Sequence, residues 1–344
     1  MSRRGARRSG GLLLAVVVLA ALWGWWSYVG PGPAARRGPS TDVVLPRGAG
    51  VRQIGAALQK AGVISSADLF ALAARLTGQA GRLQAGEYDF RSREPLADVL
   101  RDLRDGRVVR HLLTIPEGWT SGMALDALLA QPVLVGTADE PPEGSLLPDT
   151  YQVQRGEDRA EVLKRMRAAR DKLLAQLWAR RAPDLPFATP EEAVTLASIV
   201  EKETGLPAER PRVAAVFVNR LRAHMPLQSD PTVIYAVSKG RPLGRGLRAS
   251  ELAQAGPYNT YAHPGLPPTP IANPGRASLE ATLNPPKTDE LYFVANGAGG
   301  HVFASTYEDH VRNVARWRQL ERDRAQATPA PPAPAPAPAQ QGGR

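Results

Sequence analysis

Residues 11–29 carry no charged side chain and are rich in Leu, Val and Ala. Few environments accommodate such a run, and a helix needs about 20 apolar residues to cross a bilayer. Aromatic residues gather at its end, where Trp and Tyr favour the membrane–water interface; they are Trp23, Trp25, Trp26 and Tyr28. The run therefore predicts a transmembrane helix over residues 11–29.

The charges that flank this run predict its orientation. Arginines crowd residues 1–10, whereas only Arg36 and Arg37 follow shortly after the run. The positive-inside rule places residues 1–10 in the cytoplasm and the rest outside, on a single-pass protein of the plasma (inner) membrane. A cleaved signal peptide is the alternative. It would have a shorter apolar region and a small-residue cleavage site, where this chain has tryptophans.

Composition excludes several classes of function. The net charge of +10 derives partly from the N-terminal arginines, and no long basic run follows, so we expect no nucleic-acid partner. The chain has no Cys, which excludes disulfides and thiolate metal sites. Its five histidines lack metal-ligand spacing, and no nucleotide-binding fingerprint occurs. We therefore expect neither a metal nor a cofactor.

The positions of the Pro-rich segments suggest the domain organisation. Residues 30–40 are a Pro/Gly linker, and residues 328–344 are a Pro/Ala-rich tail that we expect to be disordered. A first folded module over residues 41–105 contains a β-α-α-β pattern at 42–90. A larger, mostly helical region then covers residues 106–327.

One helix stands out in the larger region. Thr189 is a capping residue, Pro190 suits the first helical position, and Glu192 can complete a capping box. The helix should end near Gly205. At 100° per residue, Glu203 continues the apolar face of this helix at its last turn, whereas Glu201 points elsewhere.

A carboxyl at the edge of an apolar face is desolvated, and desolvation raises its pKa toward the range of a general acid. Glu203 is therefore the candidate acid/base catalyst. The plainer alternative is a structural ion pair between Glu203 and Arg210 or Arg212.

Several ordered blocks resemble the endolytic murein transglycosylase family, also called YceG-like. The resemblance covers about residues 40–320. The blocks are Ala197–Thr204 (ASIVEKET), Val216–Leu221, Leu227–Tyr235, Tyr258–Tyr261, Gly265–Gly275, Leu291–Val294, Gly299–Phe303 and Pro148–Tyr151. In this family the second glutamate of the E-K-E-T block is catalytic, and it falls on Glu203.

The resemblance implies a fold and an activity. The expected class is α+β: an N-terminal transmembrane helix, a small LysM-like β-α-α-β module, and a mostly helical lysozyme-like catalytic domain with short strands. The implied enzyme is a membrane-anchored lytic transglycosylase. It would cleave the MurNAc–GlcNAc β-1,4 bond of nascent peptidoglycan strands internally and leave 1,6-anhydro-MurNAc ends. Contact with wall-synthesis enzymes is also implied.

Polar and aromatic residues in the same blocks are candidates for substrate binding. They are Gln228, Asp230, Tyr258, Asn259, Thr260, Tyr261, Asn296 and His301. For Asp230, which precedes Pro231, an N-cap role is an equal alternative. For each tyrosine the alternative is plain packing. Two other functions stay open: a non-catalytic peptidoglycan-binding scaffold of the wall-synthesis machinery, and a muramidase that hydrolyses the same bond.

Overall fold

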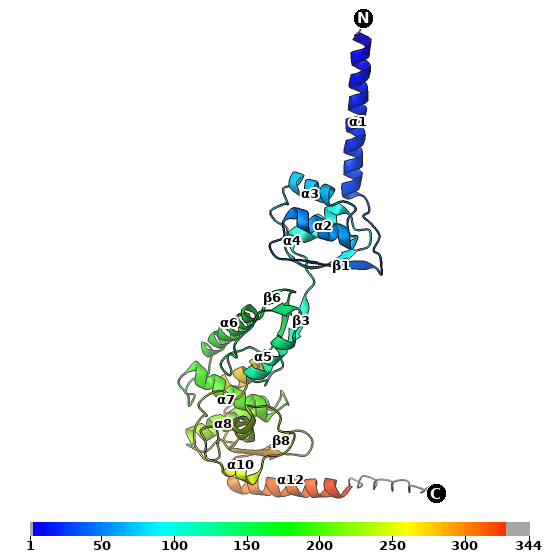
Figure 1. Ribbon diagram of the computed structural model, residues 1–344. Helices are drawn as coiled ribbons and strands as arrows, with labels where there is room; N and C mark the ends of the chain where they lie inside the picture. The colour runs from blue at the N-terminus through cyan, green and yellow to red at the C-terminus, as the bar shows by residue number, and fades with distance from the viewer. Residues whose placement is uncertain (1–2, 328–344) are drawn as a thin grey trace, which may run out of the picture. The chain divides into compact units, whose positions relative to one another are not determined.

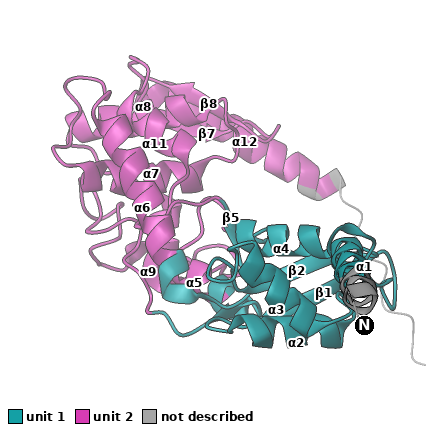
Figure 2. Cartoon of the chain, turned by 90° about the horizontal axis from the view of Figure 1, so that it is seen from above, with its two compact units in different colours: residues 1–114, 127–138, 150–162 teal, residues 115–126, 139–149, 163–344 magenta. Residues whose placement is uncertain are grey.

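The computed structural model describes residues 3–327, and the tail expected at 328–344 lies outside the described residues. The chain forms two compact units (Figures 1 and 2). Unit 1 consists of residues up to Thr114 together with Ala127–Ala138 and Thr150–Val162, and unit 2 of Ile115–Asp126, Asp139–Asp149 and the residues from Leu163 on. Helices and short strands occur in both, which confirms the α+β class.

Unit 1 contains the expected β-α-α-β order. The elements are α1 (Arg3–Val29), β1 (Ser40–Leu45), α2 (Val51–Ala61), α3 (Ala67–Leu76), β2 (Gly86–Arg91) and α4 (Leu96–Asp105). Strands β1 and β2 pair antiparallel, with Val43 opposite Tyr88. Gly62 ends α2 in a left-handed conformation (φ +83°), and the Ser66 hydroxyl caps α3 by accepting the Leu69 N–H. A core of buried apolar side chains, including Phe70, fills this unit.

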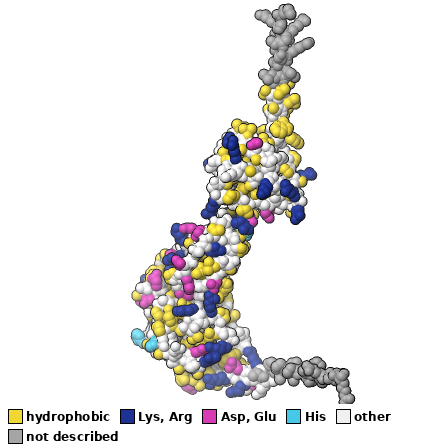
Figure 3. Space-filling view, in the orientation of Figure 1, with side chains coloured by type: hydrophobic (Ala, Val, Ile, Leu, Met, Phe, Trp, Pro, Cys, Tyr) yellow, Lys and Arg dark blue, Asp and Glu magenta, His cyan; other side chains and the backbone are white. Residues whose placement is uncertain are grey.

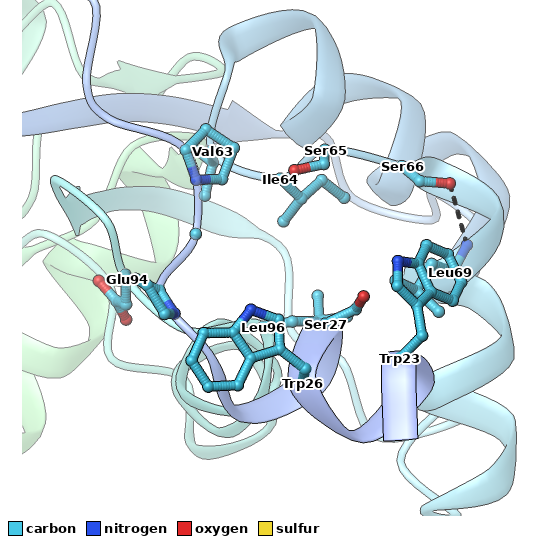
Figure 4. Close-up of a pocket in the computed structure, with 13 residues that line it drawn as sticks. Trp23, Trp26, Ser27, Val63, Ile64, Ser65, Ser66, Leu69, Glu94 and Leu96 are labelled. Carbon is cyan, nitrogen blue, oxygen red and sulfur yellow. Dashed lines mark hydrogen bonds between the residues drawn. The ribbon is translucent and has the colours of Figure 1, made fainter. Parts of the chain in front are cut away.

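Helix α1 covers the apolar run. Its outward side chains are exposed, for example Leu14 at 66% and Trp25 at 65% (Figure 3). The end of α1 lies against the rest of unit 1, where Trp23 and Trp26 line a pocket with Leu69 and Leu96 (Figure 4). In the range that the structure describes, no helix is both long and apolar enough to traverse a bilayer, so the span predicted at 11–29 is not supported.

The remainder of unit 1 consists of short strand pairs. Strand β3 (His111–Thr114) pairs antiparallel with β5 (Thr150–Val153), and β4 (Leu134–Val135) pairs parallel with β6 (Glu157–Asp158). Helices α5 (Ser121–Ala130) and α6 (Arg159–Trp178) each contribute residues to both units.

Unit 2 is built around α7 (Pro190–Glu203). Its other elements are α8 (Arg210–Arg222), α9 (Asp230–Ser238), α10 (Ala249–Ala253), α11 (Arg276–Leu283), the antiparallel pair β7 (Tyr292–Ala295) and β8 (His301–Ala304), and α12 (Tyr307–Ala327). Helix α7 contacts α8, α9 and α11. Every residue from Ala193 to Val200 is therefore buried, including the polar Thr195 and Ser198.

Candidate active site

Glu203 is the last residue of α7. The predicted capping box is present at the start of the helix, where the Thr189 hydroxyl accepts the Glu192 N–H and the Glu192 carboxylate accepts the Thr189 N–H. At the other end Thr204 leaves the helix in an extended conformation, so the helix stops before Gly205. The end of a rigid, buried helix thus fixes the Glu203 backbone, while its side chain remains partly exposed.

The hydroxyl of Ser229 donates a hydrogen bond to Glu203 Oε1. Ser229 is 1% exposed and is itself held in place, because its N–H donates to Thr260 Oγ1 (3.0 Å) and its carbonyl accepts the Thr232 hydroxyl (2.7 Å). It occupies the N-cap position of α9 without capping the helix, since its hydroxyl is directed to Glu203. The N-cap role considered for Asp230 is therefore wrong, and Asp230 is the first residue of α9.

The surroundings of Glu203 raise its pKa to about 7, and the largest cause is burial of the carboxyl. The hydrogen bond from Ser229 opposes this change because it stabilises the charged form. The negative charge of Asp230 raises the pKa further, whereas His301, when it is protonated, and the positive charge of Arg220 lower it. Near neutral pH the group is thus divided between its acid and base forms, which suits a residue that donates and later accepts a proton.

Two basic side chains, those of His301 and Arg220, act electrostatically on Glu203. Arg220 of α8 is 7% exposed, and it donates to the carbonyls of Leu227 (2.8 Å) and Leu291 (2.7 Å). It thereby ties α8 to the segment before Ser229 and to the start of β7. His301 of β8 is oriented by Glu209, whose Oε2 lies 2.8 Å from His301 Nδ1.

Three of the predicted substrate-binding residues lie around the Glu203 carboxyl. Asp230 and His301 act electrostatically on Glu203. The pKa of Tyr261 is raised mainly by burial, then by its contact with Asp230, and to a smaller extent by the charge of Glu203. The Tyr261 hydroxyl donates to Asp230 Oδ1 at 2.6 Å, so the second carboxylate has one oxygen engaged. Asp230 and Tyr261 are both exposed and are therefore accessible to a ligand.

The remaining predicted residues have internal partners. The buried Asn259 amide donates to the carbonyls of Leu252 and Gln254 at 2.8 Å each, and Thr260 supports Ser229. The side-chain oxygen of Asn296 (Oδ1) accepts two backbone N–H groups of its own turn.

Gln228 and Tyr258 also make contacts within the protein. Gln228 is exposed with a left-handed backbone (φ +52°), and its Oε1 lies 3.4 Å from Arg220 Nη1. The Tyr258 ring packs at 5.1 Å from the ring of Tyr235.

Arg210 and Arg212, the ion-pair partners considered for Glu203, pair with other glutamates. Arg210 pairs with the buried Glu201 (3.3 Å), which also accepts the Gly275 N–H at 2.8 Å. Arg212 pairs with Glu290. Neither arginine therefore pairs with Glu203. Within residues 3–327, no cluster of three or more His, Asp and Glu side chains is placed to hold a metal ion.

Sequence reasoning missed Ser229, Arg220 and Glu209. Ser229 and Arg220 occur inside two of the blocks that carry the family resemblance, so those blocks contained the only sequence signal for them. Glu209 follows Gly205 and Pro207 in a segment without a recognisable motif.

Comparisons with known proteins bear on this site. Residues 43–316 match the YceG-like family. The endolytic murein transglycosylase of Streptococcus pneumoniae serotype 2 (strain D39 / NCTC 7466) is 32% identical over 323 residues, which cover 79% of this chain and 57% of that protein. The endolytic murein transglycosylase of Bacillus subtilis (strain 168) is 29% identical over 303 residues, with 79% of this chain and 83% of that protein covered.

A solved structure is similar as well. The crystal structure of a yceG-like protein from Listeria monocytogenes matches with a TM-score of 0.51 and 28% sequence identity, and the match covers 80% of this chain and 98% of that one. The chain thus spans 57% of the length of the pneumococcal relative but nearly all of the Listeria structure.

Proposed function

The chain belongs to the YceG-like family, and on this premise we propose that it is an endolytic peptidoglycan lytic transglycosylase. In this proposal it cleaves the MurNAc–GlcNAc β-1,4 bond and leaves 1,6-anhydro-MurNAc ends. The observation that carries the proposal is Glu203, a residue at the end of a buried helix whose carboxyl has a pKa raised to about 7 by burial. Relatives named endolytic murein transglycosylases support the substrate class.

The proposed reaction needs one carboxyl group. Glu203 protonates the glycosidic oxygen as the bond to C1 of MurNAc breaks. The resulting carboxylate then takes the proton of the C6 hydroxyl of the same sugar while that oxygen bonds to C1. Water takes no part, so no second carboxylate has to activate it, unlike in an inverting glycosidase. Ser229 orients Glu203 for both steps, and Tyr261 and Asp230 are proposed to contact the sugars.

The products of the reaction test the proposal. The purified full chain, incubated with isolated peptidoglycan, is expected to release fragments with 1,6-anhydro-muramoyl ends, detected by mass spectrometry. Reducing ends would instead identify a muramidase and make Asp230 the candidate second carboxylate. Binding to the polymer without any release would favour a scaffold.

Membrane attachment is a further part of the proposal. Its support is the sequence of residues 11–29, which lacks charged side chains, and the flanking arginines. The same proposal makes residues 41–105 a LysM-like module and residues 106–327 the catalytic region. The enzyme would act on nascent strands beside wall-synthesis enzymes.

Fractionation of cells tests the attachment. The full chain is expected in the membrane fraction after a carbonate wash, whereas a chain that starts at residue 38 should be released. A matched chain with residues 328–344 removed serves as the control and should stay with the membrane. Recovery of the full chain in the wash would contradict the anchor.

A further inference from the structure

Unit 2 has an open cavity of about 520 Å³ that the chemistry proposed for Glu203 does not use. One wall is apolar and consists of Val233, Ala236 and Val237 of α9. Tyr258 forms part of another wall, and Lys239 and Glu251 are the charged residues of the lining. The cavity therefore combines small apolar side chains with two charges of opposite sign.

Only one of these two charges is available to a ligand. The Glu251 carboxylate is bound by both terminal nitrogens of Arg245, so its charge is compensated within the protein. No carboxylate forms an ion pair with Lys239 in the described part of the chain, and its Nζ lies 5.5 Å from the ring centroid of Tyr235 and 6.0 Å from that of Tyr258. The cavity thus presents one uncompensated ammonium group, which favours an anionic ligand.

The backbone of Lys239 is held firmly in place. Lys239 is the C-cap of α9 with a left-handed backbone (φ +54°), and its N–H donates to the Tyr235 carbonyl at 2.9 Å. The Tyr235 ring beneath it is 7% exposed, and its hydroxyl donates to Glu143 Oε2 at 3.3 Å. A firmly held backbone reduces the conformational entropy that is lost when the Lys239 ammonium group binds a partner.

Helix α9 connects this cavity to the candidate active site. Its first residue follows Ser229, which contacts Glu203, and its C-cap is Lys239. A rise of about 1.5 Å per residue separates these two ends by roughly 14 Å. The loop that supplies Tyr258 to the cavity also supplies Tyr261, the partner of Asp230.

We propose that the cavity binds the stem peptide that MurNAc carries on its lactyl group, with a peptide carboxylate on Lys239 and alanine methyl groups against Ala236 and Val237. Stem peptides are short, rich in alanine and rich in carboxylates, which matches the chemistry of the lining. A peptide that branches from a sugar near Glu203 can extend over a distance like that of α9, since an extended chain spans about 3.3 Å per residue. This inference rests on the proposed function.

The preference between two substrates tests the inference. Initial rates of the full chain are measured on glycan strands that carry stem peptides and on strands from which an amidase has removed them. Lys239→Met keeps the aliphatic part of the side chain but removes its charge. In this variant the rate on peptide-bearing strands, divided by the rate on peptide-free strands, should fall about three- to tenfold, as expected for one partly screened, charge-assisted contact. Lys287→Met, an exposed lysine outside the cavity, is the control and should leave the ratio unchanged.

A binding measurement separates failure of the inference from failure of the proposed function. Calorimetric titration with a soluble stem tetrapeptide should give a three- to tenfold weaker affinity for Lys239→Met than for the wild type. If strands are not cleaved but this difference appears, the function is wrong and the cavity assignment stands. If strands are cleaved while Lys239→Met changes neither the ratio nor the affinity, the cavity assignment is overturned, and Lys239 serves only the end of α9.

Discussion

Glu203→Gln is expected to reduce formation of anhydro-muramoyl products by about 10²- to 10⁴-fold, the range for loss of a general acid–base group. The amide keeps the size of the side chain and can still accept the Ser229 hydrogen bond, but it can neither donate a proton to the glycosidic oxygen nor take one from the C6 hydroxyl. Product release is measured by mass spectrometry with the wild type and the variant at equal concentration.

The pH dependence of the wild type follows from the same group. The first step needs the protonated carboxyl, whose pKa is about 7, so the rate should fall as the pH rises above about 7. The fall should be absent from the residual rate of Glu203→Gln. A rate that keeps its full value to pH 9 would contradict the assignment of Glu203 as the acid.

Unfolding cannot explain the expected loss. The pKa of Glu203 is higher in the folded chain than the ordinary value of 4.5, so this group destabilises the fold as the pH rises from about 4.5 through about 7. Above that window the cost reaches up to about 3 kcal/mol. Glu203→Gln removes the charge and should be at least as stable as the wild type at pH 8. Glu191→Gln, an exposed glutamate of the same helix, is the matched control and should retain activity.

The local parts of the site could be predicted from the sequence. The capping box at Thr189 and Glu192 and the position of Glu203 near the end of the apolar face depend on neighbours within one helix, and the structure has both. The burial of Thr195 and Ser198 could not be predicted in the same way. It results from the packing of α8, α9 and α11 on all sides of α7, and these helices are distant in sequence.

The partners of polar side chains were harder to predict than the residues themselves. Asn259, Thr260 and Asn296 have the chemistry of a sugar-binding cleft, but the loops use their polar atoms to satisfy backbone groups. Ser229 showed the opposite problem, because its local position is that of an N-cap while its hydroxyl reaches Glu203, which is separated from it by 26 residues. Only the folded arrangement decides which of two available partners a hydroxyl takes.

Asn273→Ala is expected to destabilise unit 2 by about 3 to 5 kcal/mol, because it leaves several buried polar groups without partners. The Asn273 side chain is fully buried. Its amide nitrogen donates to the Trp119 carbonyl (3.0 Å) and the Ser121 hydroxyl (3.2 Å), and its oxygen accepts the Leu146 N–H (2.9 Å). It thereby joins three separate segments of unit 2 at one point.

Urea unfolding together with hydrogen exchange would measure this effect within unit 2. Peptides that cover Ile115–Asp126 and Asp139–Asp149 should lose protection in Asn273→Ala, and the unfolding midpoint should fall. Asn296→Ala is the matched control, since that side chain serves a partly exposed turn and its loss should cost about 1 kcal/mol or less. Equal losses in the two variants would mean that the buried network contributes no more than an ordinary turn.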